Sequence, residues 1–147
     1  MAETFTLATQ QPKQSIDITD AVAKRIQAAP VRDGLCHVMV LHSTAAVVVN
    51  ETHDPNIGAD LIDALDRAIP DHAGWLHDQI DDNAQAHIKA AILGPSELIP
   101  VRHGELVLGT WQRIMLLEFD GPRKRQISVQ LIGAGGGERS PSGTRAV

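Results

Sequence analysis

Histidine is the residue type in this sequence that most readily suggests chemistry. Seven of the 147 residues are histidines, and His42, His77 and His87 fall at a strand end, in a polar loop and at a helix start. Neutral imidazole binds zinc, copper, iron and nickel, so these three side chains predict a divalent metal site if they converge. Their spacings of 35 and 10 residues match no local zinc motif. Each histidine taken alone is also explained as a partly buried structural residue.

Four further polar residues lie where a carboxylate or an amide can act. Glu51 and Asp54 flank the start of a predicted helix, and Asp54 fits the N-cap before Pro55, whereas Glu51 is free to bind a ligand or a loop amide. Gln112 and Glu118 share one face of a predicted strand, because side chains alternate with a period of two. Glu118 interrupts an apolar run and needs a partner there. A catalytic role and a structural hydrogen-bond network both remain open for this pair.

A glycine in the strand-rich last third of the chain marks another candidate segment. Gly109-Thr110-Trp111-Gln112 places Gly where strands favour larger residues, which indicates a bulge or a close approach to a ligand. Thr110 and Trp111 are therefore binding candidates. Phosphate-binding loops, dinucleotide fingerprints and nucleophile elbows do not occur in the sequence. Three arginines nearby can bind phosphate oxygens instead: Arg102, Arg113 and Arg123.

The elements that must position these residues form an α+β pattern. Alternating and β-branched runs predict about seven short strands, including 35–41, 45–49 and 106–111. A short polar turn joins the first two as a hairpin or a sharp bend. Three helices are predicted, and a long polar loop, 71–83, of a length that is often functional, precedes the last one. Short strands, partly in hairpins, favour an α+β domain over a doubly wound sheet.

Composition limits the class of protein. A chain of 147 residues fits one domain, here 1–133, followed by a Gly- and Ser-rich segment, 134–147, that is predicted to be a flexible tail. A net charge of −5, with two Trp, two Phe and no Tyr, argues against a nucleic-acid binder. No apolar run approaches the ~20 residues that span a bilayer. One cysteine excludes an internal disulfide, so we expect a cytoplasmic protein without a membrane partner.

Five segments of the sequence carry a family resemblance. They are His42-Ser43-Thr44-Ala45, Asn50-Glu51 with Asp54-Pro55, Ala86-His87-Ile88-Lys89, Gly109-Thr110-Trp111-Gln112, and Glu118-Phe119-Asp120-Gly121-Pro122-Arg123. In this order they resemble the YjbQ family, whose members are often described as secondary thiamine-phosphate synthases. The similarity extends from about Thr4 to Gly133.

The resemblance implies a compact α+β fold of packed β-sheets, a homotrimer, and a pocket lined by the matched polar residues. Strands that are apolar on both faces, such as 114–117, independently predict cover by another subunit. The match also implies a divalent metal, zinc or another transition metal, with magnesium as an option for a diphosphate substrate. The expected metal ligands are His42, His77 and His87, the expected catalytic residues are Glu51, Asp54, Gln112 and Glu118, and the expected binding residues are Thr110, Trp111 and Arg123.

The activity implied by the resemblance is that of a thiamine-phosphate synthase, which joins a pyrimidine diphosphate to a thiazole phosphate and releases pyrophosphate. The alternative is a non-catalytic trimer that binds a metal or a small ligand. The sequence departs from the family pattern in one place, because members often carry a Glu-Gly pair after the histidine of the long loop. Ile80-Asp81 stands near that position here, and Asp81 or Asp82 is the candidate for the missing carboxylate.

Overall fold

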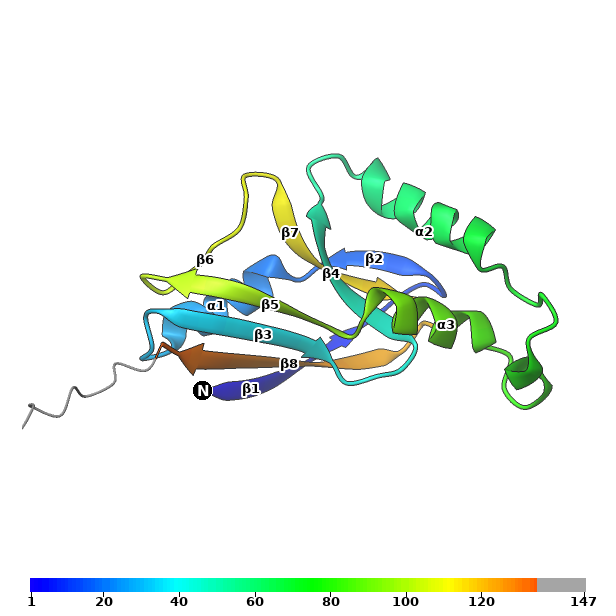
Figure 1. Ribbon diagram of the computed structural model, residues 1–147, viewed down its shortest axis with the longest axis horizontal. Helices are drawn as coiled ribbons and strands as arrows, with labels where there is room; N and C mark the ends of the chain where they lie inside the picture. The colour runs from blue at the N-terminus through cyan, green and yellow to red at the C-terminus, as the bar shows by residue number, and fades with distance from the viewer. Residues whose placement is uncertain (135–147) are drawn as a thin grey trace, which may run out of the picture.

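Two antiparallel β-sheets form the centre of the molecule (Figure 1). The computed structural model describes residues 1–134, so the predicted tail lies outside the described residues beyond Ala134. The larger sheet has the strand order β1-β8-β3-β5-β6 and the smaller one β2-β7-β4. The strands are β1 Ala2–Ala8, β2 Gln14–Asp17, β3 Gly34–Val40, β4 Ala45–Glu51, β5 Ser96–Arg102, β6 Glu105–Leu106, β7 Gln112–Glu118 and β8 Lys124–Gly133.

Three α-helices accompany the sheets. They are α1 Thr19–Ala28, α2 Asn56–Ala68 and α3 Ala84–Leu93, and a short 3-10 turn, η1 Leu76–Gln79, lies in the long polar loop. This architecture confirms the predicted α+β fold, with eight strands where about seven were expected. None of the helices in the described part of the chain is long and apolar enough to cross a membrane.

The main hydrophobic core lies between the two sheets and α1. Strands β3, β5 and β8 supply it from the larger sheet and β4 and β7 from the smaller one, while Val22 and Ile26 close it from α1. Cys36 is fully buried in this core, and burial raises the pKa of its thiol to about 11. A thiol held in its neutral form is a poor nucleophile, so Cys36 acts as a packing residue, as the sequence indicated.

Strand β7 is apolar on both faces, and both faces are covered within one chain. Ile114 and Leu116 point into the main core. Met115 and Leu117 pack in a second cluster with small residues of α3 and partly buried leucines of α2. The expectation that the run 114–117 needs cover from another subunit was therefore wrong, because α2 and α3 supply that cover.

One connection decides between two alternatives that the sequence left open, and another differs from the sequence-based expectation. β3 pairs with β5 and β8 while β4 pairs with β7, so the segment between β3 and β4 is a bend from one sheet to the other and not a hairpin. The predicted strand 106–111 ends at Leu106. Beyond it, Gln112 N–H donates to the carbonyl of Gly109 (2.9 Å), and the Gly109 N–H donates to Gln112 Oε1 (2.8 Å). These local bonds close a tight loop in place of the strand.

A buried lysine holds α2 against α3. Lys89 of α3 is fully buried, and its ammonium donates to Gln85 Oε1 (2.8 Å) and to the carboxylate of Asp66 on α2. Lys13 donates to the same carboxylate (2.9 Å) and to Asp71 (2.9 Å). Burial opposes the ionisation of Asp66, but its bonds to Lys89 and Lys13 outweigh burial and lower its pKa.

A buried ion pair joins the two sheets. Glu118 ends β7, Arg125 lies near the start of β8, and their side chains are 0% and 2% exposed. Arg125 donates from Nε to Glu118 Oε2 (2.7 Å) and from Nη2 to Oε1. Thr9 donates to Glu118 (3.0 Å), as does the Asp120 N–H (2.9 Å), and Thr44 accepts from Arg125 (2.8 Å). The ends of β1 and β7 and the starts of β4 and β8 therefore meet at one internally neutralised pair.

Removing one partner of this ion pair should destabilise the protein strongly. Arg125→Met leaves the Glu118 carboxylate buried without its cation, and we expect the free energy of unfolding to fall by about 3–5 kcal/mol. Glu118→Leu should have a comparable effect, because it leaves the guanidinium unpaired. The double variant should recover much of the loss, since neither charge remains. Chemical denaturation of wild type and the three variants measures this, and losses that simply add in the double variant would contradict it.

Candidate functional site

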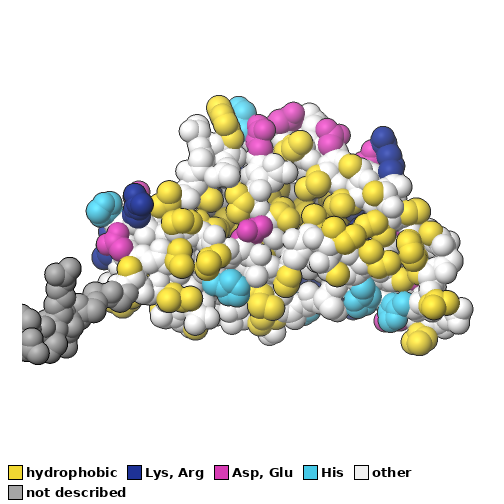
Figure 2. All heavy atoms as spheres, in the orientation of Figure 1, with side chains coloured by type: hydrophobic (Ala, Val, Ile, Leu, Met, Phe, Trp, Pro, Cys, Tyr) yellow, Lys and Arg dark blue, Asp and Glu magenta, His cyan; other side chains and the backbone are white. Residues whose placement is uncertain are grey.

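Three of the predicted site residues, His42, His87 and Arg123, line one cleft. It lies where β3 bends into β4, α3 begins and β7 turns into β8, and its volume is about 890 Å³. Figure 2 shows histidine side chains gathered at the end of the molecule where α3 lies. The other polar residues on the cleft wall are Ser43, Thr44, Asp81, Asn83, Asp120 and Arg125.

The side chain of His42 is fixed by a backbone hydrogen bond. Its Nε2 accepts the N–H of Gln126 on β8 (2.9 Å), so the neutral ring carries its proton on Nδ1. Burial lowers the pKa of His42, and the charges of Arg125 and Arg123 lower it further against the opposing effect of Glu118. At pH 7 His42 is therefore neutral and acts as a hydrogen-bond donor through Nδ1.

A second hydrogen-bond chain runs from the long loop to the β7–β8 turn. Asn83 Nδ2 donates to Asp120 Oδ2 (3.1 Å), and Asn83 Oδ1 lies 3.1 Å from His77 Nε2. Asp120 Oδ2 also accepts from Arg123 Nη2 (2.8 Å). Because Asn83 Oδ1 can only accept, His77 Nε2 carries the proton and the neutral ring has a free lone pair on Nδ1. His77 and His42 are thus held in opposite tautomers.

The third predicted ligand, His87, lies between the other two histidines. Its ring meets the ring of His77 edge to face, with centroids 5.0 Å apart, and it lines the same cleft as His42. The ligand nitrogens of the three do not converge. Within residues 1–134, one set of histidine and acidic side chains has ligand atoms that all lie within 4.8 Å of one another, and this set is His72, Asp78 and Asp82 of the long loop.

The donor chemistry of the three histidines fits a metal only in part. A metal-bound histidine normally donates its other ring N–H to a nearby acceptor. His77 satisfies this rule, because its Nε2–H faces Asn83 and its Nδ1 is free. His42 does not, because its Nε2 accepts the Gln126 N–H and its Nδ1 carries the proton. In the observed conformation neither nitrogen of the neutral His42 ring has a lone pair free for a metal, and Nδ1 can only donate.

Glu118 is placed behind the cleft and not on its surface. Its carboxylate is fully buried and accepts bonds from Arg125, Thr9 and the Asp120 N–H. Arg125, in contrast, lines the cleft. The sequence left open a catalytic role and a structural hydrogen-bond network for Glu118. The geometry favours the structural network, because Glu118 positions Arg125 and has no acceptor directed at a ligand.

The remaining predicted residues lie at the other end of the β4–β7 ladder. Glu51 and Gln112 are cross-strand partners at that end, whereas Glu118 ends β7 near the cleft. Six residues at about 3.3 Å each place these ends about 20 Å apart. Thr110 and Trp111 precede Gln112 directly in the loop. The structure therefore brings these four residues together, but away from the histidines and away from Glu118.

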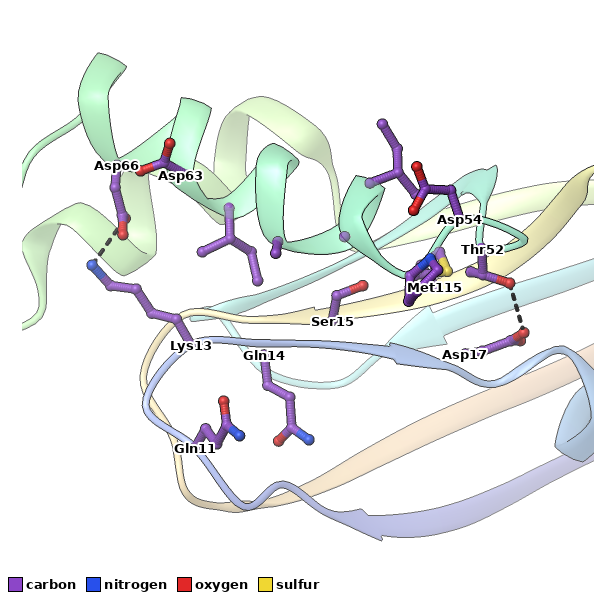
Figure 3. Close-up of a pocket in the computed structure, with 15 residues that line it drawn as sticks. Gln11, Lys13, Gln14, Ser15, Asp17, Thr52, Asp54, Asp63, Asp66 and Met115 are labelled. Atoms are coloured by element: carbon purple, nitrogen blue, oxygen red, sulfur yellow. Dashed lines mark hydrogen bonds and ion pairs between the residues drawn. The ribbon is translucent and has the colours of Figure 1, made fainter.

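Asp54 belongs to a different cavity. This cavity, of about 610 Å³, lies between α2 and β2, and Figure 3 shows Asp54 and the Lys13–Asp66 ion pair among its lining residues. Asp54 Oδ1 accepts the backbone N–H of Asn56 (2.9 Å), the first residue of α2. The N-cap of α2 is Pro55, so the predicted cap position of Asp54 is wrong by one residue, and the Asp54 side chain instead closes a turn directly before the helix.

Five polar residues of the cleft escaped the sequence analysis as site candidates: Ser43, Thr44, Asn83, Asp120 and Arg125. Asn83 precedes α3, and a helix cap is a sufficient explanation for an asparagine there. Its bonds to His77 and Asp120 could therefore not be recognised from the sequence. Arg125 had an indirect signal. A carboxylate inside the apolar run of β7 requires a buried cation, and Arg125 is the residue that the β7–β8 turn brings back to it.

The fold and the cleft together define an α+β protein of two antiparallel sheets with a histidine-lined site at one end. A family model described as "UPF0047 protein YjbQ-like" matches residues 3–134. The chain therefore belongs to the YjbQ/UPF0047 family, which confirms the resemblance found in the sequence.

Relatives and solved structures agree with this assignment. A UPF0047 protein from Archaeoglobus fulgidus is 43% identical over 128 residues, covering 87% of this chain and 98% of the relative. The UPF0047 protein YjbQ from Salmonella typhimurium is 40% identical over 132 residues, covering 86% and 95%. The crystal structure of a YbjQ-like protein of unknown function from Sulfolobus solfataricus superposes with a TM-score of 0.87 at 39% identity, covering 90% and 96%. These similarities give the family and the fold, and no reaction.

Titration of His42 should make stability depend on pH. The pKa of His42 is lowered in the folded state, so the unfolded chain binds the proton more tightly. The free energy of unfolding should therefore decrease as the pH is lowered through about 6.5. His42→Gln keeps an acceptor for the Gln126 N–H but cannot be protonated. We expect this variant to lose less stability than wild type between about pH 7.5 and about pH 5.

Denaturation curves at the two pH values measure the effect. His37→Gln, on the half-buried outer face of β3, is the matched control, because it removes an imidazole and leaves the Gln126–His42 bond in place. An unchanged pH dependence in His42→Gln would show that His42 is not the group responsible.

Proposed function

We propose that the cleft binds a small phosphorylated substrate and that the protein catalyses a thiamine-phosphate synthase reaction. A pyrimidine diphosphate is joined to a thiazole phosphate, and pyrophosphate leaves. The observation that carries the proposal is a set of hydrogen-bond donors on one cleft wall: the Nδ1–H of His42, the hydroxyl of Ser43 and the guanidinium of Arg123. Fixed donors of this kind stabilise the negative charge that collects on a leaving pyrophosphate.

Arg123 is held ready for this role. Its Nε donates to the Asp120 carbonyl (2.7 Å) and its Nη2 to the Asp120 carboxylate (2.8 Å), yet 53% of its side chain stays exposed. The carboxylate offsets much of the arginine charge, so recognition depends on directed hydrogen bonds more than on a strong positive field. Arg123 and Asp120 also belong to one of the five segments that resemble the family.

A divalent metal, the homotrimer and the cytoplasmic location are parts of the same proposal. His77 and His87 would hold the metal, with Asp81, which lines the cleft together with His87, as the carboxylate of the altered loop. His42 would join them only after it gives up its bond to Gln126. When bound, such an ion neutralises the charge of a diphosphate. The support for the trimer is the family resemblance.

Product formation by purified protein tests the reaction. Protein prepared from a host that lacks its own thiamine-phosphate synthase should form thiamine phosphate from the two precursors. Arg123→Ala should lower the rate at least about tenfold, which corresponds to about 1.4 kcal/mol of lost transition-state stabilisation. Arg102→Ala, an exposed arginine at the end of β5, is the matched control and should retain the rate. Binding of pyrophosphate without product would overturn the reaction and leave the non-catalytic ligand-binding trimer.

Metal content of single variants tests the metal. Protein taken directly from cells, without chelator, should contain a divalent metal that is lost in His77→Ala and His87→Ala and retained in His103→Ala. Occupancy should fall as the pH is lowered, because protons compete with the metal for the imidazole nitrogens. His72→Ala distinguishes the other group of ligand atoms, since loss there alone would place the metal in the long loop. Equal content in all variants would contradict the proposed histidine site.

A further inference from the structure

The five segments shared with the family are divided between two distant surfaces. The first surface is the cleft. The second, which we call the tip, consists of residues from the β4–α2 and β6–β7 loops, which lie side by side at one edge of the molecule (Figure 1). About 20 Å of paired strand separates the two surfaces, so no single chain can bring them together. The tip residues are Glu51, His53, Thr110, Trp111 and Gln112.

The tip presents an exposed aromatic ring on a rigid loop. Trp111 is 57% exposed, although it is one of only four Trp and Phe residues in the chain. Its ring lies against that of His53, with centroids 4.7 Å apart. The two hydrogen bonds between Gln112 and Gly109 fix the loop behind it. A pre-organised tryptophan loses little entropy on binding, and such residues dominate the energetics of protein interfaces.

A recess suited to an aromatic ring adjoins the cleft and shares His42 and His87 with it. This recess, of about 370 Å³, opens between His42 and His87 and is otherwise walled by small side chains. Small apolar walls and two imidazole rings match the apolar face of an indole. The small residues that line it are Ser43, Ala45, Ala90, Ala91 and Pro95.

Charges at the two surfaces are complementary at one point. Glu51 forms no ion pair in the described part of the chain. Arg123 on the cleft wall binds Asp120 through Nε and Nη2, and 53% of its side chain remains exposed. A guanidinium with an unused edge is a good partner for a carboxylate that arrives from another chain.

We infer that Trp111 of one copy inserts between His42 and His87 of a second copy, and that Glu51 and Gln112 thereby complete the site of that second copy. The tip and the cleft are different surfaces, so the contact is heterologous, and repeating it by rotation closes a ring. The proposed homotrimer is such a ring. The inference rests on the proposed function only in that the cleft is the binding site.

Crosslinking between introduced cysteines tests the contact. In a Cys36→Ala background, Thr110→Cys at the tip is combined with Ala91→Cys at the recess, which keeps Trp111 intact. A short bis-maleimide cannot bridge these positions within one chain. We expect crosslinked dimers and trimers, and no larger species, on a denaturing gel. Each single-cysteine variant should remain unlinked. Thr110→Cys with Ile132→Cys, on the outer face of the larger sheet, is the matched control and should not form the ladder.

Fluorescence provides the second measurement. In a Trp75→Phe variant, Trp111 is the single tryptophan, and its emission should shift to longer wavelength when Ala91→Arg fills the recess. Three results would overturn the inference: equal crosslinking in the control pair, no crosslinking in the test pair, or a Trp111 emission wavelength that Ala91→Arg leaves unchanged. Both measurements need no substrate. Crosslinked species without thiamine-phosphate formation would therefore reject the proposed reaction and retain the shared site. Thiamine-phosphate formation without crosslinked species would reject the shared site and retain the reaction.

Discussion

The pairing of Glu118 with Arg125 is the contact on which the cleft depends. It lies at the point where the chain passes from β7 to β8 and thus from one sheet to the other. The Glu118 carboxylate holds the guanidinium from behind and also accepts bonds from the Thr9 hydroxyl and the Asp120 N–H, while the Thr44 hydroxyl accepts from the guanidinium. The position of Arg125 is therefore set before any ligand arrives. The same charge helps to keep His42 neutral. The stability of the fold and the chemistry of the cleft therefore depend on the same buried interaction. A substitution of Glu118 or Arg125 that changes the chemistry of the cleft also changes the stability.

Hydrogen bonding gives His42, which lines the cleft, and His77, whose ring packs against His87 outside the cleft lining, different chemical characters. His42 offers a proton, because a backbone amide occupies its other nitrogen. His77 offers a lone pair, because Asn83 takes its proton, and Asn83 is itself oriented by Asp120. Each ring is thereby fixed in one tautomer, whereas a freely rotating imidazole can present either nitrogen in either role. The residues that assign these roles, Gln126 and Asn83, do so through atoms that carry no charge.

The sequence predicted the class of fold and most of its elements because each rests on local patterns. The helix start near Asp54, although displaced by one residue, and the packing role of Cys36 were visible in their neighbours. The site was harder, because its geometry depends on long-range pairing. Gln112 and Glu118 share a strand parity, which the sequence shows, but they lie at opposite ends of β7. The loop after Leu106 was missed because bonds between Gly109 and Gln112 replace strand pairing, and alternation alone does not reveal them.

Lys89 carries a consequence for how the cleft can change shape. Its ammonium is wholly removed from water and depends on Asp66 and Gln85 for compensation. Sliding α3 along α2 by even one residue would leave the Lys89 ammonium buried without a carboxylate partner, at a cost of several kcal/mol. The two helices therefore move as one body. His87 lies two residues before Lys89 on α3, so its position is fixed relative to α2 as well. A shift of α3 along α2 is therefore not a way for the cleft to open.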